Sequence, residues 1–329
     1  GPGGPGGSKA VPATVSLTET VTGSTFFAHV DHAGEVAERI RRELASRPPP
    51  PPDPTAPFSV RPGQLVAAKF SEDGGWYRAA IISADADSAA VFFRDYGNVE
   101  RVPLHPPGDS VRPLDPALAH DPPACATLCV LEGVKAPPRG VDGSEDALES
   151  EDSLEWSSRR SLADYAGGKP ILSRVARLTS RPAPAPWAPD AAPEASVVLG
   201  GVEGLEEALG GGGGGDGDDE SDGAEETPRR LDEEASASAS AAAGDAFARI
   251  SVNERMVLDG ALRVDRRYGR GGGGDGAAFA SRFAAKLSRA QEAARRARRR
   301  MWEYGDVDSD EEELDGGRRN KTGAWGRRR

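Results

Sequence analysis

Four aromatic rings and one amide are the side chains of this sequence whose types and spacing suggest binding chemistry. Phe70, Tyr77, Phe93, Tyr96 and Asn98 lie at or near the ends of predicted short strands. Ring faces attract cations, and a methylated guanidinium suits such walls because methylation removes hydration but keeps the charge. An amide oxygen would accept a hydrogen bond from a remaining guanidinium N–H. The residues alone leave a second interpretation open, since a barrel of about 45 residues also needs aromatic filling.

These side chains need a small β-barrel to bring them together. Short β-branched and aromatic runs separated by polar turns are typical of a tightly curled sheet. In this setting we interpret Trp76 as barrel filling and Asp95 as the residue that fixes the loop before Tyr96. The predicted strands are Leu65 to Phe70, Trp76 to Ile82, Ala89 to Phe93 and Val99 to Pro103.

The segments around this barrel have their own patterns. Val15 to Val21 and Thr25 to Val30 flank a short turn and predict a hairpin. Apolar residues at helical spacing then predict a helix that ends before the proline run 48–52. Further predicted elements are a strand at Ala124 to Leu131, a short helix with Leu154, Trp156, Leu162 and Tyr165, and a strand at Pro170 to Leu178.

Composition limits the size of the ordered parts. Gly and Pro supply 41 and 27 of the 329 residues, and aromatic residues only 6%. We therefore expect two modest ordered bodies rather than one large enzyme, with disordered inserts at 181–195 and 200–246. The net charge of −12 argues against wholesale coating of nucleic acid, and no apolar run is long enough for a membrane span. We expect no membrane association.

Metal and catalytic chemistry find little support in the residue pattern. Cys125 and Cys129 are too few for a zinc site, and we expect both to be reduced and partly buried. A calcium-dependent phosphodiesterase needs carboxylates held at fixed distances. The acidic run 216–220 lies in a glycine tract that cannot hold them. We predict no catalytic residues, no metal and no cofactor.

A basic segment near the end of the chain offers an alternative function. A helix is predicted from about Gly276 to Trp302, with an apolar seam of Phe279, Phe283, Leu287, Ala290, Ala294 and Met301. Its arginines could follow RNA phosphates, or they could be the solvated face of a packing helix. The acidic run 306–313 follows closely and could screen them. The candidate RNA contacts are Arg289, Arg295, Arg296, Arg298, Arg299 and Arg300.

Several motifs resemble one known family. The string AKFSEDGGWYRAAIISADADSAAVFFRDYGNVERVPL resembles the Tudor domain, above all in WYRA and DYGN. The preceding hairpin and helix, and the segment from Pro123 to Leu131, resemble the half nuclease-like barrel around an extended Tudor domain. Near the end, SVNERMVLDGALRVDRR and AAKLSRAQEAARRARRRMWEYGD are similar to the end of Tudor staphylococcal nucleases, closest to plant and algal forms. The first residue is Gly1 rather than Met, so we expect a fragment of a longer protein, and these matches indicate the C-terminal portion of such a protein.

The resemblance implies a mainly β fold with flanking helices: a Tudor barrel embedded in a staphylococcal-nuclease-like, OB-type barrel. An incomplete nuclease-like unit with a long C-terminal helix would follow. The expected division is a flexible leader 1–12, an extended Tudor domain 13–135 with its core at 60–105, an acidic linker 136–152, the incomplete nuclease-like domain 153–305, and an acidic then basic tail 306–329.

The resemblance also implies a function. Tudor domains of this family read symmetric dimethylarginine through an aromatic cage, here Phe70, Tyr77, Phe93, Tyr96 and Asn98. Phe93 stands where the family commonly has tyrosine, so we expect an altered preference rather than lost binding. The expected partners are dimethylarginine-containing, Arg/Gly-rich proteins of RNA metabolism and small-RNA silencing, in the cytoplasm with some nuclear presence. Nuclease activity of the family is attributed to upstream repeats, so we do not expect this chain to be an enzyme; part of a calcium-dependent nuclease remains the alternative.

Overall fold

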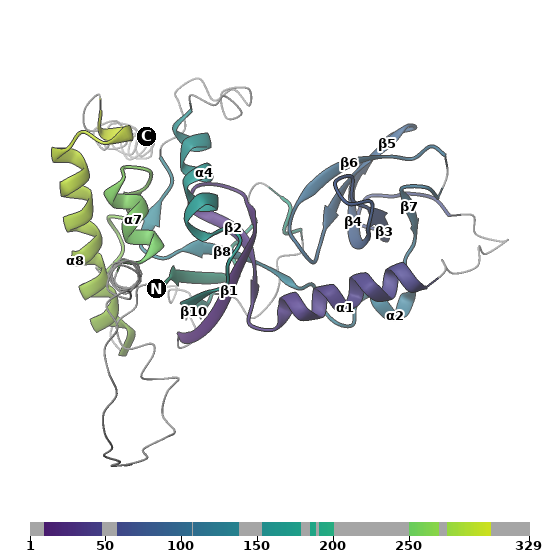
Figure 1. Ribbon diagram of the computed structural model, residues 1–329, viewed down its shortest axis with the longest axis horizontal. Helices are drawn as coiled ribbons and strands as arrows, with labels where there is room; N and C mark the ends of the chain where they lie inside the picture. The colour runs from purple at the N-terminus through teal and green to yellow at the C-terminus, as the bar shows by residue number, and fades with distance from the viewer. Residues whose placement is uncertain are drawn as a thin grey trace, which may run out of the picture. The chain divides into compact units, whose positions relative to one another are not determined.

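The computed structural model of this chain separates into two compact units (Figure 1). Unit 1 comprises residues 1–21, 25–132 and 165–252, and unit 2 comprises residues 22–24, 133–164 and 253–329. The structure describes residues 10–47, 58–106, 108–137, 153–178, 185–188, 191–200, 250–269 and 275–303. The predicted acidic run 216–220, most of the insert 200–246, and the tail 306–329 lie outside these ranges.

The first half of unit 1 is a closed five-stranded barrel. The hairpin predicted by the sequence is present, because β1 pairs with β2 in antiparallel register. β10 lies between β1 and β11, and β11 runs parallel to β8. Val175 and Val197 face each other across β10 and β11, and both are buried. The strands, in barrel order, are β1 (Val11–Thr20), β10 (Ile171–Arg177), β11 (Ala195–Leu199), β8 (Ala126–Leu131) and β2 (Thr25–Val30).

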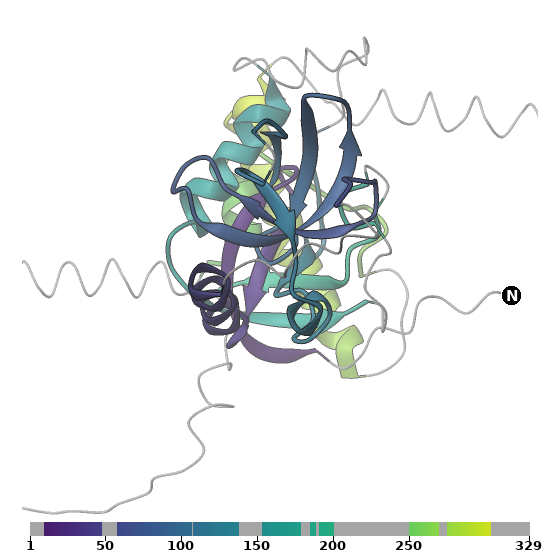
Figure 2. The same cartoon turned by 90° about the vertical axis from the view of Figure 1, so that its right-hand side faces the viewer.

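The second half of unit 1 is a five-stranded antiparallel sheet inserted between β2 and β8. The four strands expected from the sequence form it, together with a short strand that the sequence pattern did not predict. In sheet order the strands are β6 (Val99–Pro103), β5 (Ser88–Phe93), β4 (Trp76–Ala84), β3 (Leu65–Lys69) and β7 (Val111–Pro113). Figure 2 shows their strong curvature.

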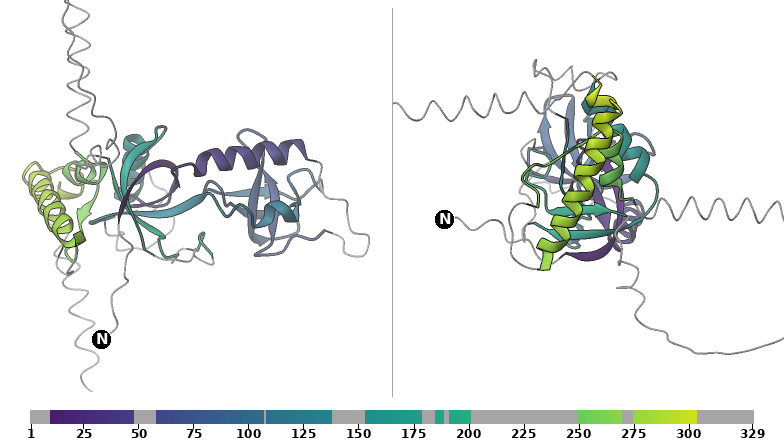
Figure 3. Two further views of the ribbon diagram at one scale, coloured as in Figure 1. Left: turned by 90° about the horizontal axis from the view of Figure 1, so that it is seen from below. Right: turned by 90° about the vertical axis from the view of Figure 1, so that its left-hand side faces the viewer.

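The two faces of this sheet build two separate apolar cores. On β3, Val66 and Ala68 point into the curved sheet, whereas Ala67 between them points outward. Helix α1 (Ala33–Ser46) covers the outward face with Ile40 and Leu44, which are 2% and 4% exposed. Burial of each such side chain contributes about 1.5–3 kcal/mol. Helix α1 lies alongside the sheet (Figure 3, left) and carries charged residues on its other face.

Trp76 and Asp95 show how strand alternation distributes the side chains of β4 and the next loop. Trp76 lies on the α1 side, where Arg112 stacks 4.1 Å from its ring centroid, rather than filling the curved sheet as the sequence suggested. The adjacent residue Tyr77 points to the inner face. Asp95 does fix the loop after β5, because Arg78 donates two hydrogen bonds to its carboxylate.

Unit 2 is mainly helical. Most of the predicted apolar seam is confirmed, since Phe283, Leu287, Ala290 and Ala294 are buried on the long helix. Phe279 is half-buried, and the buried Met301 lies beyond the end of the helix. The helix ends at Arg296, earlier than predicted, and a 3-10 turn at Arg300–Trp302 follows. The elements are β9 (Val134–Lys135), α4 (Leu154–Ala166, to Asp164 in this unit), α7 (Val252–Leu258), β12 (Arg263–Val264) and α8 (Asp275–Arg296), which Figure 3, right, shows along its length.

Two sequence-based boundaries differ from the structure. The sequence assigns 153–305 to a second, incomplete nuclease-like unit, but β10 and β11 complete the first barrel instead. The physical reason is that β1, β2 and β8 alone would leave two open edges, which strand pairing removes. The predicted insert 181–195 is also not wholly unstructured, because Trp187 packs 5.4 Å from Phe92 and β11 begins at Ala195.

Candidate functional site

The structure brings the four predicted rings together. We call Phe70, Tyr77, Phe93 and Tyr96 the aromatic cluster. The centroid distances are 6.1 Å for Phe70 to Tyr77, 5.4 Å for Phe70 to Phe93, 5.9 Å for Tyr77 to Phe93 and 5.4 Å for Tyr77 to Tyr96. The interplanar angles lie between 76° and 89°. The rings therefore meet as near-perpendicular walls rather than as a stack.

Strand register explains this convergence. Ala79 of β4 lies opposite Phe93 of β5, so Tyr77 is the diagonal neighbour of Phe93 on the same face. Phe70 follows β3 at a tight turn, in which its N–H donates to the Gly75 carbonyl. Tyr96 follows β5, and the turn that carries it is closed by Gly97, with a φ of +95° and an N–H bond to the Phe93 carbonyl.

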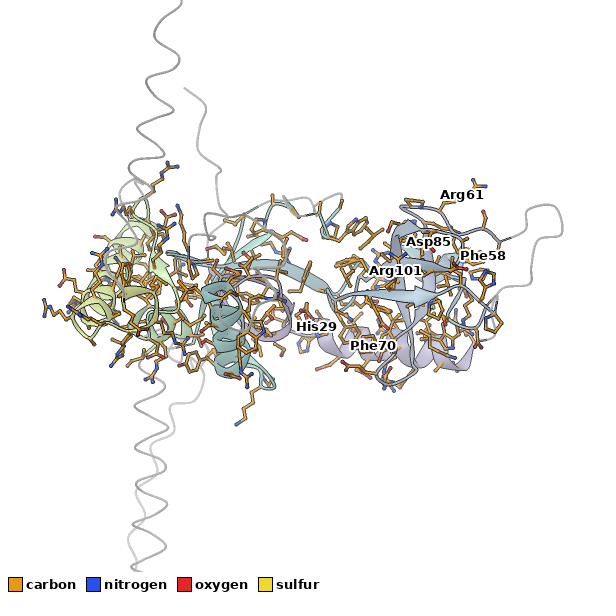
Figure 4. The ribbon with its side chains drawn as sticks, turned by 90° about the horizontal axis from the view of Figure 1, so that it is seen from above. His29, Phe58, Arg61, Phe70, Asp85 and Arg101 are labelled. Carbon is orange, nitrogen blue, oxygen red and sulfur yellow. The ribbon has the colours of Figure 1, made fainter. Side chains whose placement is uncertain are left out.

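The rings differ in exposure. Phe93 is only 1% exposed and forms the base of the cluster, whereas Phe70, Tyr77 and Tyr96 are half-buried. Burial gives a reason why a phenyl ring is suitable at position 93, because a hydroxyl there would need a buried hydrogen-bond partner. Phe70 is labelled in Figure 4.

Both tyrosine hydroxyls are anchored by carboxylates. Tyr77 donates to Asp73 Oδ2 at 2.6 Å, and Tyr96 donates to Glu38 Oε1 of α1 at 3.0 Å. Burial and the bond to Asp73 raise the pKa of Tyr77 to about 12, and burial and Glu38 likewise raise the pKa of Tyr96. The bond from Tyr77 lowers the pKa of Asp73. The cluster thus has two neutral tyrosines with anions at their hydroxyl ends.

Two further charged or polar groups lie by the cluster. Arg41 of α1 binds the second oxygen of Glu38, with an Nε to Oε2 distance of 3.0 Å. Asn98 is half-buried two residues after Tyr96, and its backbone carbonyl accepts from the Phe93 N–H. Within the described part of the chain its side-chain amide has no hydrogen-bond partner. This amide is available to a ligand.

A buried ion pair supports the loop that carries Tyr96. Arg78 is 0% exposed and Asp95 2% exposed, with Arg78 Nη2 at 2.6 Å from Asp95 Oδ1. Burial opposes the charge of Arg78, but the hydrogen bonds and attraction to Asp95 outweigh it and raise the pKa of the guanidinium. Arg78 also donates to the carbonyls of Leu118, Pro122 and Pro123, which tie the returning segment to the sheet.

The six candidate RNA-binding arginines do not form one helical surface. Arg298, Arg299 and Arg300 come after α8 ends at Arg296. Arg295 stacks 4.5 Å from the Trp302 ring centroid, and Arg296 pairs with Glu292 at 3.3 Å. Arg299 donates to the Leu258 carbonyl, and Arg300 to Ser161 Oγ. Arg289 is exposed on α8 and bonds to a carbonyl of its own helix.

The described residues contain neither a metal-binding cluster nor a membrane-spanning helix. In the ranges that the structure describes, no three or more His, Cys, Asp or Glu side chains are arranged to hold a metal ion. None of the helices in those ranges has the length and apolar character needed to cross a bilayer. Cys125 and Cys129 are buried free thiols, as the sequence predicted, and burial raises the pKa of each to about 12.

The chain is similar to several known proteins. The Tudor domain model matches residues 9–133. Ribonuclease TUDOR 1 of Arabidopsis thaliana is 27% identical over 312 residues, covering 91% of this chain and 24% of that protein. The extended Tudor domain of Drosophila melanogaster Tudor-SN (p100) superposes with a TM-score of 0.53 at 19% identity, covering 89% of this chain and 99% of that one. An extended Tudor domain of mouse TDRD1, solved with a MILI peptide containing dimethylarginine, has a TM-score of 0.41 at 22% identity, covering 57% and 81%.

The inserted sheet and its surrounding barrel have the fold of an extended Tudor domain. The match to the Tudor domain model is confined to residues 9–133. The chain is similar to Ribonuclease TUDOR 1 over most of its own length and spans about a quarter of the length of that relative.

Of the two carboxylates that bind the tyrosine hydroxyls, the sequence pattern pointed to only one. Asp73 stands beside the cluster in the loop where the sequence shows Glu72 and Asp73, and it could be noticed as a nearby negative charge. Glu38 was missed, because it lies on the polar face of a helix 58 residues away from Tyr96. Only the packing of α1 on the sheet reveals that contact.

Proposed function

We propose that this chain is a methylarginine-reading adaptor of the Tudor-SN type. The aromatic cluster carries the proposal, because the half-buried Tyr77 ring stands nearly perpendicular to the half-buried Phe70 and Tyr96 rings and to the buried Phe93 ring. Such walls present negative ring faces to a flat, weakly hydrated cation. Methyl groups on the guanidinium add apolar contact and remove hydration, whereas the positive charge stays.

The anchored hydroxyls favour the same ligand. Each hydrogen bond from a tyrosine hydroxyl to a carboxylate pushes electron density toward the ring, and the carboxylates add negative potential nearby. The Asn98 amide oxygen would accept a hydrogen bond from a guanidinium N–H that lies on a methylated nitrogen. Each terminal nitrogen of symmetric dimethylarginine carries one methyl group and one N–H, whereas the dimethylated nitrogen of the asymmetric isomer carries no N–H. We therefore expect the symmetric isomer to bind better.

An adaptor role follows from the small size of this ligand. One side chain offers little contact area, so the affinity of a single site is modest. Repeated methylarginines in an Arg/Gly-rich partner would raise the effective affinity by avidity. We propose such partners among proteins of RNA metabolism and small-RNA silencing, with catalysis, where it occurs, residing in parts of the longer protein outside this chain.

A calorimetric titration of the full chain tests the proposal. The ligands are an Arg/Gly peptide with one symmetric dimethylarginine, its asymmetric isomer and its unmethylated twin. We expect selective binding of the symmetric peptide, and at least tenfold weaker binding by Tyr96→Ala, since about 1.4 kcal/mol corresponds to tenfold in affinity.

Phe58→Ala is the matched control, because Phe58 is an aromatic residue of unit 1 that is 38% exposed and outside the cluster (Figure 4). Its affinity should equal that of the wild type. Thermal unfolding of each variant verifies the fold. Equal affinity of the wild type for methylated and unmethylated peptides would contradict the proposal.

A further inference from the structure

The loop that carries Tyr96 is held by side chains of the nuclease-like barrel. His29 lies on β2, and its Nε2 is 2.6 Å from the Asp95 carbonyl oxygen. Thr18 lies on β1, and its hydroxyl donates to the Tyr96 carbonyl at 2.5 Å. These two bonds join residues 66 and 78 positions apart in the chain, so they exist only once the barrel and the inserted sheet are packed together.

The two acceptors are consecutive carbonyls. The Asp95 carbonyl belongs to the peptide plane before the Tyr96 Cα, and the Tyr96 carbonyl belongs to the plane after it. Because peptide units are planar, the orientations of these two planes determine φ and ψ of Tyr96 and the direction of its Cα–Cβ bond. His29 and Thr18 bind the peptide units on the two sides of the Tyr96 Cα, and together they therefore restrain the direction in which the Tyr96 side chain leaves the backbone.

His29 contributes a second contact directly to the ring. Its imidazole centroid is 5.3 Å from the Tyr96 ring centroid at an interplanar angle of 66°, an edge-on arrangement. A carbonyl can only accept, so Nε2 carries the proton and the tautomer is determined. The side chain is closely confined, since it is 8% exposed and a Cβ at Gly34 would lie 3.2 Å from Nδ1. Figure 4 labels His29 between the barrel and the sheet.

The remaining contacts of this loop agree with a rigid support. Phe27 of β2 leaves no room for a side chain at Gly97, where a Cβ would lie 2.1 Å from the Phe27 Cγ. Phe27 also packs against Phe92 at 5.4 Å between centroids. This packing leaves the loop little freedom to move away from the barrel. Loss of the hydrogen bond from His29 or from Thr18 should therefore change the orientation of Tyr96.

We propose that His29 and Thr18 are positioning residues for the methylarginine site, which set the orientation of the Tyr96 wall without touching the ligand. This inference rests on the proposed function. It means that the barrel sets the affinity of the cage, because a flexible Tyr96 would have to be ordered when the ligand binds.

Two matched pairs of full-chain variants test the inference. Thr18→Val removes the hydroxyl in a nearly equal volume, and Thr18→Ser keeps it. His29→Leu removes the N–H, and His29→Gln keeps an N–H donor near the position of Nε2. The measurements are the affinity for the symmetric dimethylarginine peptide and the NMR ring resonances of Tyr96, with thermal unfolding as the fold control.

We expect Thr18→Val and His29→Leu each to weaken binding about threefold to tenfold, the equivalent of one hydrogen bond. Thr18→Ser and His29→Gln should stay within about twofold of the wild type. The Tyr96 ring resonances should shift in the two weakened variants and return in the two conservative ones.

Unchanged affinity in Thr18→Val and His29→Leu, with a wild type that binds the methylated peptide selectively, would overturn the inference and leave the proposed function intact. Failure of the wild type itself to discriminate would instead overturn the proposed function. The Tyr96 resonances still decide the positioning role in that case, because unshifted resonances in both variants would reject it.

Discussion

The aromatic cluster of unit 1 and the arginine-rich end of unit 2 were both candidate binding surfaces, but they differ in how the fold arranges their side chains. The cluster takes Phe70, Tyr77, Phe93 and Tyr96 from separate turns and strands and brings their rings within 5.4–6.1 Å. The arginines are adjacent in sequence, yet Arg295, Arg296, Arg299 and Arg300 contact groups of unit 2 itself. Closeness along the chain and closeness in space are separate properties here.

This difference shows what makes a dense set of side chains into a site. In the cluster, the carboxylates of Asp73 and Glu38 bind the tyrosine hydroxyls rather than the rings. In unit 2, the partners occupy the guanidinium groups themselves. Substitutions in the two regions should therefore have effects of different size.

The largest effect is expected for the buried ion pair beneath the Tyr96 loop. Asp95→Ala leaves Arg78 charged and without its carboxylate at 0% exposure, so the free energy of unfolding should fall by about 3–5 kcal/mol. Urea unfolding measures this loss. Glu292→Ala, which breaks the exposed pair with Arg296 in unit 2, is the control and should cost less than about 1 kcal/mol. Similar losses of unfolding free energy in the two variants would contradict the expectation that the buried pair stabilises the chain more than the exposed pair.

A smaller effect should separate two neighbouring arginines of α8. Arg295→Ala removes the contact with Trp302, whose side chain is buried, and should lower the stability of unit 2 by about 1–2 kcal/mol. Arg296→Ala removes an exposed pair and should change it by less than about 0.5 kcal/mol. Thermal unfolding followed by far-UV circular dichroism compares them. Equal and negligible effects would return Arg295 to the candidate RNA-binding residues.

The smallest effect is spectroscopic and concerns the anchored hydroxyl of Tyr77. Its pKa is raised to about 12, so the folded chain keeps a proton that an unfolded tyrosine loses near pH 10. The stability from this group is therefore complete below pH 10 and disappears as the pH rises through about 12. Phenolate absorbance of the wild type minus that of Tyr77→Phe should show no ionisation at pH 10.

Asp73→Asn is the matched variant for this titration. It removes the charge that disfavours the phenolate, so Tyr77 should ionise at lower pH than in the wild type. An unchanged ionisation curve would mean that Asp73 does not hold the hydroxyl.

Local periodicity predicted the elements of the fold well where neighbours in sequence determine them. The hairpin, α1 with Ile40 and Leu44, the four strands from β3 to β6, and most of the seam of α8 are confirmed. Short strands that depend on distant partners were missed. β11 has only five residues after a proline-rich tract, and its strand identity comes from pairing with β10 and β8.

The candidate site was predictable in its members but not in its supports. A family resemblance placed the five cage residues, and the structure brings the four rings together. Glu38, Thr18 and His29 gave no signal, because a hydroxyl, an imidazole or a helix-surface carboxylate looks the same whether or not a loop packs on it. Their contacts with the Asp95–Tyr96 segment exist only in the folded chain.

The order of strands in the barrel has a consequence for the growing chain on the ribosome. The last strand of the inserted sheet is β7 at Val111–Pro113. The barrel, in contrast, can close only after β10 and β11 have been synthesised, and β11 ends at Leu199. Until then β1 and β8 each have an unpaired edge, and such edges can pair with other chains. A nascent chain thus carries a finished inserted sheet on an unfinished barrel, and a chaperone that shields strand edges would act between these two points of synthesis.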